Sequence, residues 1–286
     1  MQLSMSSRIA EDALSLHDPA ETVDRIVRFL NTHTERIGAK NVIVGMSGGL
    51  DSSVTATLCA MAVGGQRTIG LCLPEEETKN SRNLKDAQDV AEKRGIRFRS
   101  LDISPLVQAT KDLVHSSNRG SRIPMGNAKA RLRAMILYYY ANTTKGLVVG
   151  TGDKSEIMLG YFTKYGDGAC DIQPIADLYK TTVRHLGKHL GLPLGIYSKP
   201  SSPDLWPGQT AEEELGLGYE KLDLVLWGLE RWMEPREIGR DLGLAVRIVE
   251  GVKQRWLRAE QKRRPPLALK LGFRTSSQDL RLPYLL

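Results

Sequence analysis

The chain has 286 residues, of which 41% are hydrophobic and 26% charged, a composition that excludes a disordered protein and predicts a globular one with its own core. Its net charge of +7 suits anionic ligands such as nucleotides but does not by itself indicate nucleic acid. No apolar run is long enough to cross a bilayer, and nothing at the start resembles a signal peptide. The cysteines are sparse (Cys59, Cys72 and Cys170), which argues against a disulfide framework or a zinc site. We therefore expect a cytoplasmic protein.

The first predicted helix follows an N-terminal arm. Residues 1–17 read as a loosely attached arm. Asp18, Pro19 and Glu21 then place a capping acid, a first-turn proline and a second acid at the spacing typical of a helix start. Apolar residues recur at helical spacing up to Gly38, which predicts the end of the helix.

A glycine turn between a strand and a helix is the most informative stretch. The apolar run 42–44 predicts the strand, an Ala- and Leu-rich segment predicts the helix, and residues 45–53 between them read Gly-Met-Ser-Gly-Gly-Leu-Asp-Ser-Ser. Gly48 and Gly49 permit a tight turn with open N–H groups at a helix start, which favours phosphate. Asp51 could hold a divalent metal against that phosphate. A glycine turn can also merely join a strand to a helix, and this one is not a P-loop because Gly-Lys-Ser/Thr is missing.

Beyond the turn, predicted strands and helices alternate along the chain. Strands are expected at 68–73, 96–103 and 146–150, and helices at 84–94, 105–115, 127–142 and 178–190. This order predicts an α/β fold: a doubly wound, mostly parallel sheet with helices on both faces. Because ligands bind at the carboxyl ends of such strands, the loops that follow segments 41–47 and 146–152 should share a site.

The last third of the chain differs from the rest in composition and periodicity. Residues 198–216 are rich in Pro, Ser and Gly and too long for a simple connector, which favours a lid and leaves a disordered excursion as the alternative. Residues 217–286 are expected to be helical and amphipathic up to Pro265. We therefore divide the chain into the arm, a main domain of residues 18–216 that includes the lid, and a helical extension packed on that domain.

A second group of polar residues follows the strand at 146–150. Between positions 151 and 171 the chain is punctuated by glycines and holds Thr151, Glu156, Lys164, Asp167 and Asp171. Magnesium prefers one or two protein carboxylates together with phosphate oxygens, so a second acid here would complete a metal site with Asp51. Glu156 is the best placed candidate.

Four motifs together resemble the ammonia-dependent NAD synthetases, a family of N-type ATP pyrophosphatases with the adenine nucleotide alpha-hydrolase-like fold. They are SGGLDSS (47–53), GTGDKSE (150–156), GYFTKYGDGACD (160–171) and PGQTAEEELG (207–216), and the resemblance runs from about residue 20 to about residue 266. It implies a ligase that forms a C–N bond, converting deamido-NAD, ATP and ammonia into NAD, AMP and pyrophosphate through an adenylated intermediate, with Mg²⁺ bound. It also implies a homodimer, which a pairing through 127–142 would suit.

The same resemblance implies roles for individual residues. The implied ATP-binding residues are Gly45, Met46, Ser47, Gly48, Gly49, Leu50, Asp51, Ser52, Thr151, Lys180 and Ser201, with Ser202 as an alternative to Ser201. The implied deamido-NAD-binding residues are Arg131, Lys164, Asp171, Gln261 and Lys262. Asp51 and Glu156 would hold magnesium, and Asp51 and Lys180 would act in catalysis. Gln261 stands where the family usually has His, which leaves one substrate contact open.

Simpler readings stay open for some of these residues. Lys180 and Arg131 lie on predicted helices, where such side chains usually form a solvated face. The glycine turn also occurs in related ligases and in tRNA thiolases, but the pair of working cysteines that a thiolase would need is not evident. No amidase domain is evident before the turn either, so we expect the nitrogen to come from free ammonia or from ammonia handed over by a separate partner. Residues 236–264 have a helix–turn–helix look with a basic tail, which would suit DNA binding, but their apolar residues, such as Val249 and Val252, suit packing better.

Overall fold

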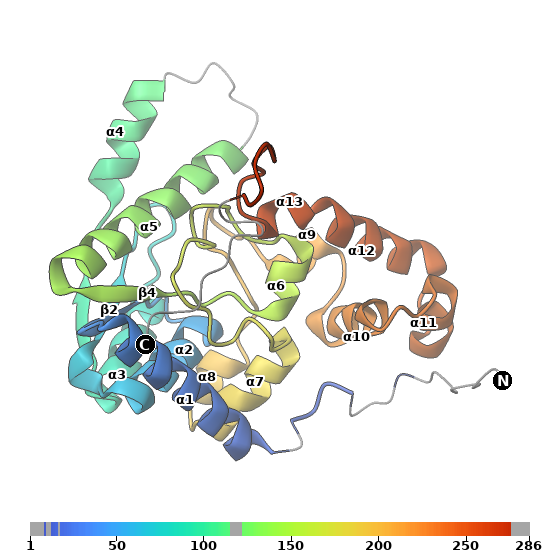
Figure 1. The fold of residues 1–286 in the computed structure, drawn as a ribbon, viewed down its shortest axis with the longest axis horizontal. Coiled ribbons are helices and arrows are strands. Elements are labelled where there is room, and N and C mark those ends of the chain that lie inside the picture. Colours follow the sequence, from blue (N-terminus) through green and yellow to red (C-terminus); the bar gives the residue numbers. More distant parts are fainter. Residues whose placement is uncertain (1–8, 10–12, 17, 115–121, 276–286) are drawn as a thin grey trace.

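A four-stranded parallel sheet lies at one end of the molecule (Figure 1). The computed structural model describes residues 9, 13–16, 18–114 and 122–275. The strands are β1 (Asn41–Gly45), β2 (Thr68–Cys72), β3 (Arg97–Ser100) and β4 (Gly146–Val149), in the order β3-β2-β1-β4. Because every pairing is parallel, all four strands end at the same edge of the sheet. The predicted α/β fold with a parallel sheet is confirmed.

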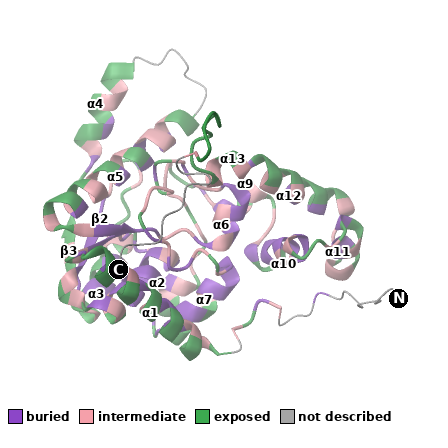
Figure 2. Cartoon of the chain, in the orientation of Figure 1, coloured by how far each residue is buried: buried purple, intermediate pink, exposed green. Residues whose placement is uncertain are grey.

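Helices cover both faces of the sheet, as the alternation predicts. One face is covered by α1 (Pro19–Ile37), α2 (Leu50–Val63), α3 (Ser81–Lys93) and α7 (Lys180–His189), and the other by α4 (Ser104–Val114) and α5 (Ile123–Thr144). Successive strand residues point to opposite faces, so Val42 and Val44 join the core beneath α1, α2, α3 and α7, while Ile43 joins the core beneath α4 and α5. Figure 2 shows the buried residues gathered on the strands and on the helix sides that face them.

Helix starts differ from the predicted ones where a cap lies outside the apolar pattern. α3 begins at Ser81, three residues before its first predicted residue, because the Asn80 side chain accepts hydrogen bonds from the N–H groups of Arg82 and Asn83. α5 begins at Ile123 with a proline in its first turn. The Asp18 cap and the left-handed Gly38 at the two ends of α1 are confirmed.

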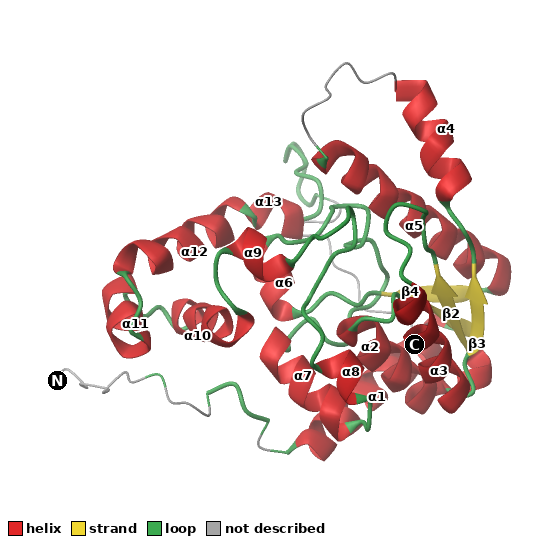
Figure 3. Ribbon diagram, turned by 180° about the vertical axis from the view of Figure 1, so that it is seen from behind, coloured by secondary structure: helices red, strands yellow, loops and turns green. Residues whose placement is uncertain are grey.

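The C-terminal helices lie beside the sheet and the helices that cover it (Figure 3). Besides the packing around the sheet, a second hydrophobic core holds these helices together. The remaining elements are η1 (Gly65–Arg67), α6 (Lys154–Leu159), α8 (Leu194–Tyr197), α9 (Ala211–Leu215), α10 (Tyr219–Glu230), α11 (Pro235–Leu242), α12 (Val246–Arg258) and α13 (Glu260–Arg263). α10 contacts both α6 and α7, and α12 contacts α6. The helices after residue 217 are therefore packed against the elements that follow β4.

Two residues of the N-terminal arm are packed on the C-terminal helices. Most of residues 1–17 lie outside the described residues, but Ile9 and Leu14 are buried in the second core. The Ile9 N–H donates to Asp241 Oδ2 at 3.3 Å, and the Leu14 carbonyl accepts from Thr182 Oγ1 at 3.0 Å. The described part of the arm is thus held by hydrogen bonds as well as by apolar contacts.

The helix–turn–helix look of residues 236–264 corresponds to α11 and α12. Gly243 ends α11 with a φ of 63°. Val249 and Val252 of α12 are buried in the second core, so the apolar side of the supposed recognition helix is used for packing. Among the helices that the structure describes, none combines the length and apolarity that spanning a membrane requires.

Candidate functional site at the carboxyl edge of the sheet

The glycine turn after β1 is fixed by its own hydroxyl groups and by contact with α3. The Ser47 and Ser52 hydroxyls lie 3.2 Å apart, and Ser47 Oγ accepts from the Gly49 N–H at 3.2 Å. Gly48 has a φ of 79°, and a Cβ there would come within 2.0 Å of the Asn83 carbonyl oxygen, so only glycine fits. The N-terminus of α2 begins directly after the turn, which favours an anion at this place.

Not every residue of the turn offers its side chain to a ligand. Met46 and Leu50 have 1% and 7% of their surface exposed and belong to the core beside the sheet. Among the residues predicted to bind ATP, these two could therefore contribute only backbone groups.

A capping box brings a second pair of acids to the same edge. Asp153 Oδ1 accepts from the Glu156 N–H at 2.8 Å, and Glu156 Oε2 accepts from the Asp153 N–H at 3.3 Å, so the pair starts α6. Thr151 lies just before them, after the end of β4. Because β4 runs beside β1, the box lies next to the glycine turn.

Lys180 joins the two loops. Its Nζ lies 2.7 Å from Asp51 Oδ2 and 2.8 Å from both Asp153 Oδ2 and Glu156 Oε1, and the lysine side chain is fully buried. The prediction that the loops after β1 and β4 come together at one edge of the sheet is therefore confirmed. Asp153 is the acid that sequence reasoning missed, because the Asp-x-x-Glu spacing of a capping box marks it only as a helix start.

The charges in this cluster are unevenly matched. Burial raises the pKa of Asp153 and of Glu156, and the neighbouring carboxylates raise both further. Burial alone would lower the pKa of Lys180, but the three carboxylates outweigh it and hold that pKa well above its ordinary value. Lys180 therefore remains an ammonium ion that faces more acids than it can neutralise.

These acids fit a hard divalent cation. Asp51, Asp153 and Glu156 can each offer one oxygen, and the three oxygens lie within 4.8 Å of one another. Asp51 Oδ1 is buried and, among the described residues, has no hydrogen-bond partner. Carboxylate oxygens at such spacing are the ligands that magnesium prefers.

Four of the five residues predicted to bind deamido-NAD lie together around the loop after α6. Arg131 Nη2 donates to the Lys164 carbonyl at 3.3 Å, and Lys164 Nζ donates to the Gln261 carbonyl at 2.6 Å. Lys262 Nζ donates to the carbonyl of Phe162 at 2.8 Å. The basic C-terminal run is thus fastened to this loop through backbone carbonyls.

Asp171, the fifth of these residues, makes its contacts at the sheet. Its carboxylate accepts from the Tyr138 hydroxyl at 3.1 Å and from the Val148 N–H at 2.8 Å. Tyr138 belongs to α5 and Val148 to β4, so Asp171 is placed between a helix and the strand that precedes the second motif.

The segment 198–216 touches the glycine turn through a lysine that sequence reasoning missed. Lys199 Nζ donates to the Gly48 carbonyl at 3.2 Å and to Asn83 Oδ1 at 2.7 Å, and it pairs with Asp86 Oδ2 at 2.8 Å. Two positions later, the Ser201 carbonyl accepts from the Ala211 N–H, at the start of α9. The segment is a loop up to α9, held against the turn and α3.

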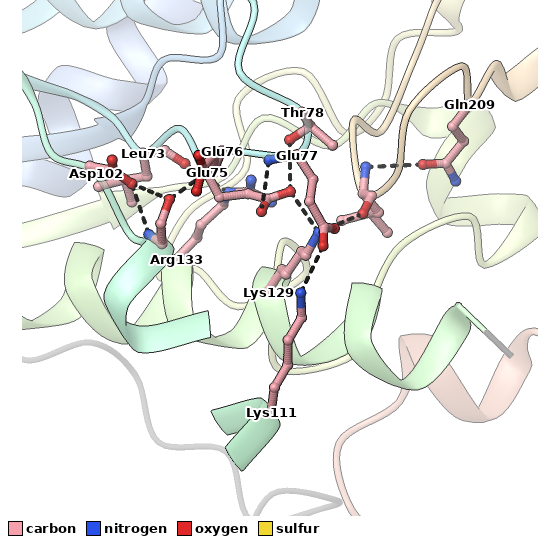
Figure 4. A network of polar contacts seen from close by, with 12 residues as sticks. Leu73, Glu75, Glu76, Glu77, Thr78, Asp102, Lys111, Lys129, Arg133 and Gln209 are labelled. Carbon is pink, nitrogen blue, oxygen red and sulfur yellow. Dashed lines mark hydrogen bonds and ion pairs between the residues drawn. The ribbon is translucent and has the colours of Figure 1, made fainter. Parts of the chain in front are cut away.

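A buried ionic network, also missed, holds the middle of this segment (Figure 4). Lys129 Nζ, on α5, donates to Glu75 Oε1 at 2.6 Å, to Glu77 Oε2 at 2.8 Å and to the Leu205 carbonyl at 3.2 Å. The side chains of Lys129 and Glu75 are each only 2% exposed. The network therefore links the loop after β2, helix α5 and the segment 198–216.

The chain matches known proteins over most of its length. A family model for NAD synthase matches residues 22–266. An NH(3)-dependent NAD(+) synthetase from Hyperthermus butylicus is 44% identical over 244 residues, which are 85% of this chain and 88% of that protein.

Solved structures show a similar fold. An NMN synthetase from Francisella tularensis has a TM-score of 0.77 and 32% identity, covering 90% of this chain and 100% of that one. An NH3-dependent NAD synthetase from Campylobacter jejuni, solved with a nitrate ion, has a TM-score of 0.75 and 29% identity, covering 88% of this chain and 100% of that one.

Proposed function

Because the chain belongs to the NAD synthase family, we propose that it amidates deamido-NAD with ammonia at the expense of ATP, giving NAD, AMP and pyrophosphate. The observation that carries this proposal is the meeting of a glycine turn at a helix N-terminus, three carboxylates and a buried lysine at the carboxyl edge of the sheet. A helix–turn–helix DNA-binding function is not favoured, because α12 uses its apolar side for packing.

The chemistry needs two displacements. In the first, an oxygen of the nicotinate carboxylate attacks the α-phosphorus of ATP, the bond to the bridging oxygen breaks, and pyrophosphate leaves. In the second, ammonia attacks the carbonyl carbon of the mixed anhydride, the C–O bond breaks, AMP leaves, and the nitrogen loses a proton. Since a free carboxylate is a poor acyl donor, the adenylate supplies the good leaving group.

The residues of the turn and Lys180 suit the first displacement. The N–H groups around Gly48 and Gly49 and the N-terminus of α2 would bind the phosphates, with Ser47 and Ser52 as hydroxyl donors. Lys180, kept charged by its carboxylates, would neutralise negative charge on the phosphates. Thr151 and Ser201 would contact ATP from the two neighbouring loops.

The acids suit a magnesium ion. Asp51 and Glu156 would hold it, and Asp153 is a third acid within reach. Such an ion bound to phosphate oxygens would offset the charge that develops as pyrophosphate leaves.

The group around the loop after α6 would bind deamido-NAD. Arg131, Lys164 and Lys262 place positive charge near one another, which suits the phosphates of a dinucleotide, and Gln261 and Asp171 would supply polar contacts. We propose that the enzyme works in the cytoplasm, and its free cysteines agree with a reducing compartment.

We also propose that two copies pair through α5. Met135 and Tyr139, four residues apart on this helix and therefore on one side of it, are each more than half exposed. Large apolar side chains gathered on one exposed helix mark an interaction surface, so this observation supports the homodimer.

A product assay tests the proposed function. Protein, magnesium, ATP and ammonium are incubated with deamido-NAD or, in parallel, with nicotinate mononucleotide, the acid that an NMN synthetase would amidate. We expect NAD with equal amounts of AMP and pyrophosphate, and much slower turnover of the mononucleotide. Faster amidation of the mononucleotide would mean that the mononucleotide, and not deamido-NAD, is the substrate. No cleavage of ATP with either acid would contradict the proposal.

A further inference from the structure

Helix α10 presents two buried polar residues to the lysine of the site. Tyr219 and Asp223 are four residues apart, so they lie on the same side of the helix, and neither has any exposed surface. α10 packs against both α6, which carries Glu156, and α7, which carries Lys180. Neither the strand pattern nor the glycine motifs point to these two residues.

Asp223 fixes the backbone from which Lys180 projects. Its Oδ2 accepts from both the N–H and the Oγ1 of Thr181 at 2.8 Å, and its Oδ1 accepts from Ser155 Oγ at 2.6 Å. Ser155 Oγ in turn accepts from the Lys180 N–H at 3.0 Å. One carboxylate thus ties the first turn of α7 to α6.

This contact replaces a cap that α7 lacks. The N-cap residue of α7 is Tyr179, whose side chain makes no capping hydrogen bond. The first N–H groups of a helix need acceptors, and a carboxylate also complements the positive end of the helix dipole. Asp223 meets both needs from another helix, so the start of α7 depends on α10.

Tyr219 lies against the other end of the lysine. The Lys180 Nζ is 5.4 Å from the centre of the Tyr219 ring, a distance at which an ammonium ion is attracted to an aromatic ring. In the described part of the chain the Tyr219 hydroxyl has no hydrogen-bond partner. The ring, and not the hydroxyl, is therefore what Tyr219 offers to Lys180.

We propose that Asp223 and Tyr219 are positioning residues for Lys180, Asp223 by fixing the backbone of the lysine and Tyr219 by confining its ammonium group. The inference rests on the proposed function, because it takes Lys180 to act on the phosphates of ATP. A displacement of a charged group by about 1 Å can slow an enzyme by about a hundredfold.

The first experiment compares Asp223→Asn with Asp241→Asn. The side chains of both aspartates are largely buried and accept a hydrogen bond from a backbone N–H, but Asp241 lies on α11 and its partner is Ile9. We expect Asp223→Asn to lower kcat about 10- to 100-fold at an unchanged KM for deamido-NAD. Asp241→Asn is expected to leave kcat unchanged. A wild-type kcat for Asp223→Asn would overturn the role of Asp223.

A double variant separates positioning from general support of the fold. In a Lys180→Met protein, which circular dichroism must show to be folded, Asp223→Asn should have no further effect on residual AMP formation. An equal fold-loss on both backgrounds would mean that Asp223 does not act through the lysine. If Asp223→Asn does not fold, Ser155→Ala removes the link to the Lys180 N–H with little change in volume and is expected to lower kcat in the same way.

Tyr219 is tested by two substitutions. Tyr219→Phe keeps the ring and should keep the wild-type kcat, whereas Tyr219→Leu removes the ring and should lower it. Equal rates for the two variants would overturn the role of the ring. A wild-type protein that forms no NAD would contradict the proposed function, whereas wild-type NAD formation with unaffected variants would contradict only this inference.

Discussion

At the scale of the residue, the site depends on an imbalance between acids and bases. Asp51, Asp153 and Glu156 share one lysine, so each carboxylate repels the other two. Two of these acids and the lysine are predicted from motifs in the sequence. Asp153 is not, because its position before a helix reads as an ordinary cap, and only the folded chain shows that its second oxygen faces Lys180.

Replacing Asp51 tests that imbalance. We expect Asp51→Asn to lower kcat by about a hundredfold or more, because charge stabilisation at the phosphates is lost. The same variant should unfold at a temperature no lower than wild type, because one of three mutually repelling acids is neutralised. Thermal unfolding and the product assay measure both effects.

An exposed aspartate provides the control for Asp51. Asp89 pairs with Lys85 on the surface of α3. Asp89→Asn should change neither activity nor unfolding temperature. Near-normal turnover of Asp51→Asn would refute the role given to that carboxylate.

Two glycines with a positive φ allow the cost of backbone strain to be measured separately from the cost of a steric clash. Gly38 and Gly48 both have a positive φ, but a Cβ on Gly38 meets nothing within 4 Å, whereas one on Gly48 meets the Asn83 carbonyl oxygen at 2.0 Å. We expect Gly38→Ala to cost about 1 kcal/mol of unfolding free energy at an unchanged KM for ATP. Gly48→Ala should cost more and raise that KM at least severalfold, as denaturant unfolding and steady-state kinetics would show. Equal effects would mean that contact with α3 does not shape the turn.

At the scale of the element, the sequence predicts what depends on local pattern. The strand positions follow from apolar, β-branched runs and agree with the structure within a few residues. The network around Lys129 could not be predicted, because a lysine on an apolar helix reads as solvated until the loop after β2 is known to lie over it. The same applies to Asp223, whose partners are on α6 and α7.

Breaking the Lys129 network should destabilise the fold. Glu75→Gln leaves a buried ammonium ion without its closest counter-ion, and we expect a loss of about 3 kcal/mol of unfolding free energy. Adding Lys129→Met should recover part of that loss, because the unpaired charge is removed. Urea unfolding of both variants measures the difference, and a further loss in the double variant would contradict this account.

The exposed acid of the network gives a pH dependence. Hydrogen bonds from Lys111 and Lys129 lower the pKa of Glu77 from 4.5 to about 2. A lowered pKa in the folded state means that the carboxylate stabilises the fold above pH 4.5 and that this contribution is lost as the pH falls towards 2.

Glu77→Gln should therefore flatten the acid side of the stability profile. We expect the loss of unfolding free energy between neutral pH and about pH 3 to be smaller in this variant than in wild type. Because Glu77 is half exposed, the difference should shrink in high salt. Glu76→Gln, at the neighbouring exposed position, is the matched control and should keep the wild-type profile.

At the scale of the whole molecule, the exposed side of α5 predicts self-association. Tyr139→Glu places a charge on that side and should shift the protein from dimer to monomer, which sedimentation would detect. Trp232 is even more exposed but lies just after α10, and Trp232→Glu should leave the dimer intact. A wild-type protein that sediments as a monomer would contradict the pairing.

The dependence of Lys180 on α10 has a consequence for the newly made chain. Asp51 precedes Lys180 by 129 residues in the sequence, and Thr181 precedes Asp223 by 42, so the ribosome makes these parts in that order. At roughly 5–20 residues per second, the glycine turn exists for roughly ten to thirty seconds before the helix that fixes its lysine has been synthesised. A nascent chain would therefore carry the glycine turn before its lysine is fixed, and the proposed turnover of ATP would begin only after α10 has been synthesised.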